Sequence, residues 1–283
     1  MSLRRLVKPV LAPVVHWALR RAARAYVAGD RVEDAARVAD RLAAEGLAAT
    51  LGFWNDKQDA PRLVADHYLD CIRCCRAGDY VSIKLPAIDH SRVLFDQVAA
   101  EAGMAGVRLH FDAMQPDTAR RLQTFIDGLP VEVIARVGVT LPGCWARSAG
   151  DADWAVERAL PVRIVKGQWP DPDQPDIDPR AGFLRVVDAL AGRGTHVAAA
   201  THDAPLARRA LERLAASGTH CELELLYGLP RRRALAVAAS LRVRARVYIG
   251  YGFSFVPYAA GRLLDDPRRL VWLLRDALGL GAR

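Results

Sequence analysis

Short stretches rich in β-branched residues alternate with helical patterns along this chain, and this alternation limits the fold more than any other feature. We predict strands at 46–54, 80–85, 106–112, 132–141, 161–166, 196–201, 221–226 and 246–250. We predict helices at 34–45, 61–76, 92–102, 117–127, 151–159 and 181–191, then after Asp203, from Arg231, and across the C-terminal region. Successive strand–helix units imply a parallel sheet, and eight of them close into a (β/α)8 barrel, the TIM barrel, in a chain of about this length.

The composition fits one domain with a large apolar core. Of the 283 residues, 52% are hydrophobic and 25% are charged, and no internal repeat or low-complexity linker divides the sequence. We therefore predict a single domain over 1–283, with residues 1–45 as a helical segment packed on the barrel. The net charge is +8, but the basic residues are scattered along the chain. We predict no nucleic-acid partner, because such partners need clustered positive charge.

Residues 1–26 are both basic and apolar, yet they do not have the pattern of a membrane span. Their apolar part, 9–19, is too short to cross a bilayer and contains two prolines. We predict a helix packed on the domain, and a peripheral contact with the inner face of a membrane stays open as the alternative.

The five cysteines do not suggest a disulfide framework in a chain of this length. Cys71, Cys74 and Cys75 resemble half of a zinc site, but no second pair of ligands stands at a suitable spacing, and they fit a helix packed in the core. We predict no metal site, and a reducing cytoplasm is the simplest compartment.

Polar side chains stand at the predicted end of nearly every strand. In a (β/α)8 barrel the carboxyl ends of all strands meet at one face, where active sites lie, and buried polar groups are costly unless they are paired or bind a ligand. We therefore predict one site at this face. The strand-end residues are Trp54, Asn55, Lys84, Asp112, Pro142, Arg163, Lys166, Thr201, His202, Glu224, Tyr227 and Tyr248.

The stretch 161–169 shows this pattern most clearly. Arg163 and Lys166 belong to a short apolar strand, Gly167 follows at once, and a proline-rich loop begins after Trp169. Only four of the 40 basic residues are lysine. Lys84 and Lys166 are two of them, which indicates a role for a compact ammonium group at these strand ends.

Taken together, these motifs resemble the FAD-dependent proline dehydrogenases. The resemblance runs from about Tyr26 to the last helix and depends on the order and spacing of the motifs. They are Ser-Ile-Lys84-Leu-Pro-Ala, Leu-His-Phe-Asp112-Ala, Arg163-Ile-Val-Lys-Gly, Ala-Thr-His-Asp203, Glu-Leu-Glu-Leu-Leu-Tyr-Gly228, Arg-Val-Tyr-Ile-Gly-Tyr-Gly252 and Tyr258-x-x-x-Arg262.

The resemblance implies a distorted barrel that holds non-covalent FAD over its carboxyl-end face, with the last helix above it. It also implies oxidation of L-proline, or a close cyclic-amine relative, to Δ1-pyrroline-5-carboxylate. Hydride would pass to FAD, and the electrons would leave for a quinone or another acceptor.

The resemblance assigns roles residue by residue. Asp112 and Arg163 would be catalytic, because Asp112 would orient the amine and a guanidinium stabilises negative charge that develops nearby. The residues assigned to the substrate are Lys84, Ile164, Tyr248, Tyr258 and Arg262. The residues assigned to the cofactor are Ala113, Arg163, Lys166, Gly167, Gln168, Thr201, His202 and Glu224.

Each assignment has a plainer structural alternative. Asp112 would serve equally as a helix cap, His202 as a turn histidine with satisfied nitrogens, and Tyr248 as a core aromatic. Lys84 and Arg262 would each fit an ordinary ion pair with another carboxylate.

The sequence also departs from the family pattern. Gly261 stands where the family has the first of two adjacent arginines, and Pro142 stands where it has a glutamine. Glu224 stands where we expect an amide. The loop after Trp169 is rewritten with Asp171, Asp173, Asp176 and Asp178, which we interpret as a solvated loop and not as a cation site.

We predict an FAD-dependent proline dehydrogenase-like enzyme with L-proline or a related cyclic amine as substrate. Two alternatives stay open. A degenerate barrel would bind FAD or a partner without turnover, and Gly261 and Pro142 favour that reading. A lyase of the aldolase type would instead use Lys166 to form a Schiff base with a carbonyl substrate.

Overall fold

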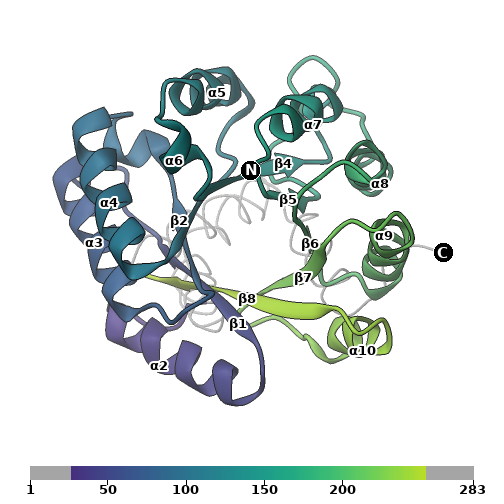
Figure 1. The fold of residues 1–283 in the computed structure, drawn as a ribbon, viewed down its shortest axis with the longest axis horizontal. Coiled ribbons are helices and arrows are strands. Elements are labelled where there is room, and N and C mark those ends of the chain that lie inside the picture. The colour runs from purple at the N-terminus through teal and green to yellow at the C-terminus, as the bar shows by residue number, and fades with distance from the viewer. Residues whose placement is uncertain (1–26, 253–283) are drawn as a thin grey trace, which may run out of the picture.

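The computed structural model describes residues 27–252, and in it eight parallel strands close into a barrel in chain order, from β1 to β8 (Figure 1). β8 returns to pair with β1, so no strand edge stays open within the barrel. The strands are β1 Ala48–Phe53, β2 Tyr80–Ile83, β3 Arg108–Phe111, β4 Val137–Pro142, β5 Val162–Val165, β6 Val197–Ala200, β7 Cys221–Leu226 and β8 Arg244–Tyr251. The predicted TIM barrel is confirmed.

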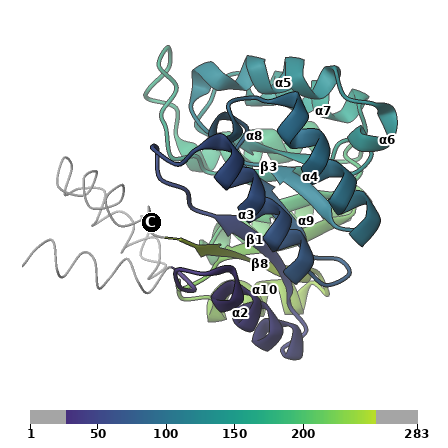
Figure 2. The same cartoon turned by 90° about the vertical axis from the view of Figure 1, so that its left-hand side faces the viewer.

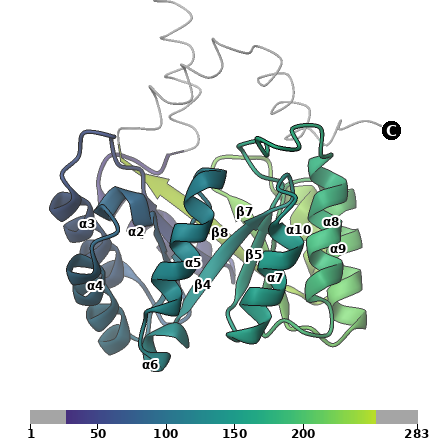
Figure 3. The same ribbon diagram turned by 90° about the horizontal axis from the view of Figure 1, so that it is seen from above.

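Helices surround the strands on the outside of the barrel (Figure 3). They are α2 Val32–Ala44, α3 Pro61–Cys74, α4 Arg92–Ala105, α5 Ala119–Asp127, α6 Val131–Ile134, α7 Ser148–Glu157, α8 Pro179–Leu190, α9 Ala204–Ala216 and α10 Arg232–Ser240. Two short 3-10 helices, η1 Leu85–Ile88 and η2 Pro116–Thr118, follow β2 and β3. The helix that precedes β1, α2, packs on β1 and β8 (Figure 2).

Side chains at the amino ends of several helices satisfy backbone N–H groups that have no partner inside the helix. The Asp203 carboxylate accepts a hydrogen bond from the Leu206 N–H at the start of α9, and Pro205 lies in the first turn, as the sequence predicts. Asp178 caps α8 in the same way, and the Ser91 hydroxyl caps α4. Local chemistry therefore sets where these helices begin.

One predicted element is wrong in part. The strand predicted at 132–141 begins only at Val137, because Val131–Ile134 forms the single helical turn α6. Pro130 precedes this turn, and the side chain of Val131 is 80% exposed. A run of β-branched residues becomes a strand only where a neighbouring strand pairs with it, and the pairing of β4 with β3 begins at Val137.

The two faces of the strands differ in chemistry. Outward residues such as Leu51, Ile83 and Leu109 are fully buried in the hydrophobic core between strands and helices. Many inward residues are instead polar or charged. The buried members include Thr50, Ser82, His110, Thr140, Arg163, Glu222, Glu224 and Arg246. Branched apolar side chains usually fill such a barrel, so these buried charges need partners inside it.

No helix within residues 27–252 is both long enough and apolar enough to cross a lipid bilayer. The predicted segment 1–26 and the predicted C-terminal helix lie outside the described residues.

Candidate active site

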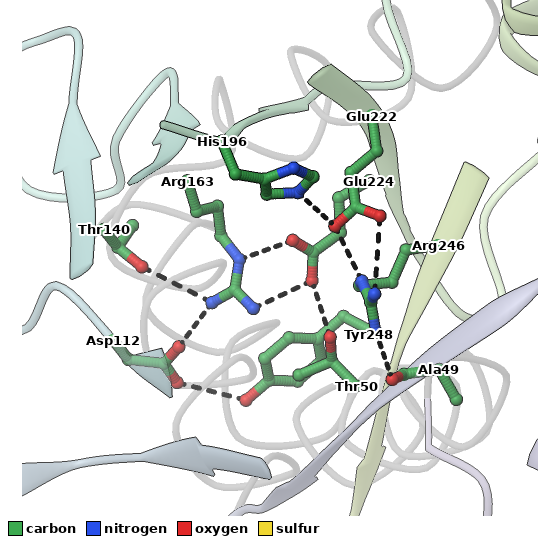
Figure 4. Close-up of polar contacts among 10 residues, drawn as sticks. All are labelled: Ala49, Thr50, Asp112, Thr140, Arg163, His196, Glu222, Glu224, Arg246 and Tyr248. Atoms are coloured by element: carbon green, nitrogen blue, oxygen red, sulfur yellow. Dashed lines mark hydrogen bonds and ion pairs between the residues drawn. The ribbon is translucent and has the colours of Figure 1, made fainter. Parts of the chain in front are cut away.

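Five polar side chains from separate segments converge near the carboxyl ends of the strands. Lys84 follows β2, Asp112 follows β3, Arg163 lies in β5, Glu224 in β7 and Tyr248 in β8. Figure 4 shows four of them turned toward one another inside the barrel. Of the residues predicted to converge, Lys84 and Arg163 each lie beside Asp112, and the roles of all of them stay predictions.

Arg163 lies at the centre of this cluster and is held by two carboxylates. Its Nε donates to Glu224 Oε2 at 2.7 Å, and its Nη2 donates to Glu224 Oε1 at 2.8 Å. Its Nη1 donates to Asp112 Oδ1 at 2.9 Å. Only 4% of the Arg163 side chain and 3% of the Glu224 side chain are exposed. Burial works against the charge of Arg163, but Glu224 and Asp112 together raise its pKa above the ordinary value.

Asp112 joins this pair to the other side chains of the site. Its Oδ2 accepts a hydrogen bond from the Tyr248 hydroxyl at 3.1 Å and lies 3.9 Å from Lys84 Nζ. Lys84 Nζ also donates to the Phe53 carbonyl at 2.6 Å. Burial lowers the pKa of Lys84, and the charge of Asp112 opposes that effect. The two cations and two carboxylates of the cluster balance, so it carries no net charge.

Two glycines make room for the aromatic side chains beside the cluster. A Cβ atom at Gly52 would overlap the hydroxyl group of Tyr248, and one at Gly250 would overlap the indole ring of Trp54. The rings of Trp54 and Tyr248 stack with their centroids 6.5 Å apart. Burial, followed by the negative charge of Asp112, raises the pKa of Tyr248 well above its ordinary value, so its hydroxyl stays protonated as a donor.

Sequence reasoning missed the contribution of these glycines, and it also missed two threonines. The Thr50 hydroxyl donates to Glu224 Oε1 at 3.1 Å, and the Thr140 hydroxyl lies 3.4 Å from Arg163 Nη1. The position of Thr50 could have been predicted from the sequence. Side chains alternate between the two faces of a strand, so Thr50 and Gly52 lie on the same, inward face of β1.

The loop after β5 lies close to the end of β4. Gly167 has a φ of +99°, and a Cβ atom there would collide with the Cys144 sulfur. The Cys144 N–H donates to the Lys166 carbonyl at 3.0 Å, which ties the two loops together. Lys166 is half-buried, and Gln168 is exposed. A glycine is therefore required at 167, as expected where the backbone must approach another group closely.

The histidine predicted to bind the cofactor has both ring nitrogens bonded within the chain. His202 Nε2 accepts from the Leu226 N–H at 2.8 Å, and Nδ1 lies 3.1 Å from the Pro230 carbonyl oxygen. Because the carbonyl only accepts, the proton lies on Nδ1. Thr201 is buried, and its hydroxyl oxygen accepts from the Asp203 N–H at 3.2 Å. A cofactor role for His202 remains a prediction, and a new bond to either ring nitrogen would replace an existing one.

The prediction that Ile164 lines the substrate pocket does not fit the structure. Successive residues of a strand face opposite sides, so Ile164 points away from the interior into which Arg163 projects. Ile164 is fully buried in the hydrophobic core. Ala113, by contrast, lines a small cavity of about 30 Å³ beside Asp112. Tyr258, Gly261 and Arg262 lie outside the described residues.

No family model matches the chain. A proline dehydrogenase of Deinococcus radiodurans is 25% identical over 284 residues, which span 89% of this chain and 89% of that protein. Proline dehydrogenase 1 of Bacillus subtilis subsp. natto is 25% identical over 289 residues, 93% of this chain and 92% of its own length.

The chain is therefore similar to proline dehydrogenases over about nine tenths of its length.

A solved structure gives the same fold. Proline utilization A of Bdellovibrio bacteriovorus matches 87% of this chain with a TM-score of 0.72 and 16% identity. The chain covers 32% of that larger protein, about a third of its length. At this identity the match supports the barrel fold and carries no residue assignment.

One of the departures from the family pattern has a visible structural role. Pro142 ends β4, and the bond of 2.5 Å that its backbone carbonyl accepts from the Ser148 hydroxyl does not require a proline. Asp171 is buried, and it accepts hydrogen bonds from the N–H groups of Ala146 and Asp173. The interpretation of the aspartate-rich loop as a solvated loop therefore does not hold for Asp171, which organises the loop. Within residues 27–252 no three His, Cys, Asp or Glu side chains are grouped to hold a metal ion.

Proposed function

We propose that this chain is a flavin-dependent dehydrogenase that oxidises L-proline or a closely related cyclic amine to the pyrroline carboxylate. The observation that carries the proposal is the convergence of Lys84, Asp112, Arg163 and Tyr248 at the carboxyl end of the barrel, in a chain with two full-length proline dehydrogenase relatives. The electrons would then leave for a quinone or another acceptor. When bound, FAD supplies the hydride acceptor.

Several features of the site fit FAD. Gly167, which follows Lys166, has no side chain, and a residue of this kind allows a ligand to approach the backbone closely. Lys166 follows directly on β5, where an ammonium group can meet a phosphate. The Arg163 guanidinium offers positive charge inside a buried site, which favours a reduced, more negative cofactor. The residues proposed to hold FAD are Ala113, Arg163, Lys166, Gly167, Gln168, Thr201, His202 and Glu224.

The same cluster suits an amino acid as substrate. Lys84 Nζ has three N–H donors, one of which binds the Phe53 carbonyl, so two remain for a substrate carboxylate. Asp112 Oδ2 already accepts from Tyr248, and it can accept from the substrate amine as well. A cluster without net charge can take a zwitterion without leaving a buried charge unpaired. The proposed roles are therefore carboxylate binding for Lys84 and amine orientation for Asp112.

A direct test uses the purified full chain. The protein is saturated with FAD, made anaerobic and mixed with L-proline while the flavin absorbance is followed. We expect L-proline, or another member of a panel of cyclic amines, to bleach the flavin band. A colourless protein that does not bind added FAD would end this proposal.

A second candidate function is a barrel that binds flavin without turnover of proline. One observation favours it, because the donors of Arg163 are largely taken up by Glu224 and Asp112. The variant Gly261→Arg, which restores the arginine pair of the family beside Arg262, separates the two. A large gain in proline oxidation indicates an enzyme that has drifted, whereas no gain indicates another substrate or none.

A further inference from the structure

A second, larger cavity lies at the opposite end of the barrel, where the strands begin. It has a volume of about 480 Å³, compared with about 30 Å³ for the cavity beside Asp112. The first residues of β2, β3, β7 and β8 line it, together with the loops that precede β4, β5 and β6. This volume falls in the range that holds small organic molecules. We call it the amino-end cavity.

A buried ion pair forms the inner wall of the amino-end cavity. Arg246 Nε donates to Glu222 Oε1 at 2.8 Å, and Arg246 Nη1 donates to the Ala49 carbonyl at 2.8 Å (Figure 4). Both side chains are only 3% exposed. Arg246 Nη2 donates a hydrogen bond to the Gly78 carbonyl at 3.1 Å. This pair closes the barrel from the inside, and its charges are already neutralised by each other.

Two histidines extend this network toward the cavity opening. His196 Nε2 lies 3.2 Å from Glu222 Oε1, and His196 Nδ1 lies 2.6 Å from His220 Nδ1. His196 Nε2 faces this carboxylate without forming a regular hydrogen bond, and the two Nδ1 atoms are close enough to share one proton. His220 is exposed and lines the cavity, and Nε2 is the ring nitrogen left over for a ligand.

Two arginines in the lining have no carboxylate partner. Arg108 and Arg244 are the first residues of β3 and β8, and no Asp or Glu within residues 27–252 forms an ion pair with either. The Arg108 guanidinium lies 5.4 Å from the centre of the Tyr80 ring, a contact that orients it without using its N–H groups. These two guanidinium groups therefore keep their donors for a ligand.

The charge of the lining favours an anion. Three arginines and two carboxylates, Asp79 and Glu222, line the cavity, so it carries one net positive charge while both histidines are neutral. Asp79 does not repel a ligand strongly, because its oxygens accept from the backbone N–H groups of Ala49 and Arg76 at 2.8 and 3.0 Å. The charge of Glu222 is likewise balanced, because its carboxylate accepts hydrogen bonds from Arg246.

We propose that the amino-end cavity is a binding site for a small oxyanion, a phosphate or carboxylate group held by Arg108 and Arg244 with His220 at its side. Guanidinium groups bind both kinds of oxyanion by paired hydrogen bonds. The Glu222–Arg246–His196 network gives the site a rigid floor, which reduces the ordering cost of binding. The cavity is larger than one phosphate ion, so the natural ligand carries an organic remainder. The site lies apart from the proposed flavin site and does not depend on it.

The test is calorimetric titration of the full chain with inorganic phosphate and, separately, with succinate. The protein is saturated with FAD beforehand, so that any flavin site is already filled. We expect saturable binding of at least one anion, and the stronger of the two identifies the group. The variant Arg108→Ala/Arg244→Ala should weaken that binding at least about tenfold, because two charge-assisted contacts are lost. The matched control Arg209→Ala, an exposed arginine of α9 outside the cavity, should bind like the parent protein.

Two results would overturn the proposal. One is the absence of saturable binding of either anion to the parent protein. The other is equal binding by the parent and the double variant. If the double variant does not fold, the single variant Arg244→Ala gives the same decision, because its side chain is exposed and unpaired and its loss leaves the core intact.

Discussion

Glu224 accepts two parallel hydrogen bonds from Arg163, of 2.7 and 2.8 Å, deep inside the barrel. Without Glu224, Asp112 would be the one carboxylate on this guanidinium among the described residues, and the cluster would carry a net positive charge. With Glu224, positive and negative charges balance. The stabilisation that Arg163 can offer to a reduced cofactor is therefore smaller than its burial alone suggests.

The first prediction concerns the reduction potential of the flavin-loaded protein. Replacing Glu224 by Gln removes one negative charge and keeps the shape, so the reduced flavin becomes easier to form. We expect the midpoint potential to rise by roughly 30–60 mV, since about 30 mV corresponds to ~1.4 kcal/mol for two electrons. Spectroelectrochemical titration measures it. The control Glu45→Gln, at an exposed residue paired with Arg231, should leave the potential unchanged. A fall, or no change, in Glu224→Gln would contradict this account.

The second prediction concerns the proposed carboxylate contact of Lys84. The variant Lys84→Met keeps the apolar stem and removes the ammonium. We expect the KM for proline to rise tenfold to over a hundredfold, the effect of losing a charge-assisted bond of about 1.5–3 kcal/mol. Steady-state kinetics measures it, with Lys57→Met as the control because Lys57 is exposed in a loop. An unchanged KM in Lys84→Met would show that Lys84 does not bind the substrate.

A third prediction compares two glycines. The variant Gly52→Ala places a methyl group where the Tyr248 hydroxyl lies. We expect a loss of about 1–3 kcal/mol in the free energy of unfolding, typical of overpacking in a core. Gly150 lies in α7 with open space around it. There the same substitution should stabilise the protein by about 0.5–1 kcal/mol, because alanine favours a helix. Denaturant unfolding of both variants measures the difference, and equal effects would refute the close approach at Gly52.

The fourth prediction follows from the pKa of Glu222. Burial acts to raise this pKa, but contacts with His196 and Arg246 outweigh burial and lower it from 4.5 to about 2. A carboxyl group with a lowered pKa stabilises the fold above its unfolded pKa, and that stability is lost as the pH falls toward the folded pKa. The parent protein should therefore lose about 3 kcal/mol from this group between roughly pH 5 and pH 2.

The variant Glu222→Gln cannot titrate at this position and provides the comparison. At pH 7 it should be less stable than the parent, because Arg246 is then buried without its partner. As the pH falls to about 2 the two proteins should approach each other in stability, since Glu222 of the folded protein gains a proton there. Urea unfolding at a series of pH values measures this gap. A gap that stays constant from pH 7 to pH 3 would rule out the ion pair as its cause.

The arrangement of the strands was largely predictable, because β-branched runs separated by helical patterns leave few other folds. The strand predicted at 221–226 agrees residue for residue with β7. The turn at Val131–Ile134 was not predictable from local preference, because its residues favour a strand and only the missing neighbour decides against one. Tertiary context decided that element.

The site was predictable as a set of strand ends but not as a set of contacts. Lys84, Asp112 and Arg163 converge because parallel strands end at the same face. The error at Ile164 was avoidable, since the inward position of Arg163 already places its neighbour outward. The bidentate pairing of Glu224 with Arg163 could not be read from the sequence, because 61 residues separate them and their approach depends on barrel closure.

The placement of Glu222 and Glu224 on the same face of β7 has a consequence for how the chain avoids misfolding. Glu222 forms an ion pair with Arg246 near the start of the strand, and Glu224 forms one with Arg163 farther along it. The leucines between and beside the two glutamates point outward. A slip of β7 by a single position would bury both acids in hydrocarbon and set leucines against two bare guanidiniums. Misaligned pairing would leave buried charges unpaired at both ends of β7, which costs free energy. The two glutamates therefore fix the register of β7 against its neighbouring strands.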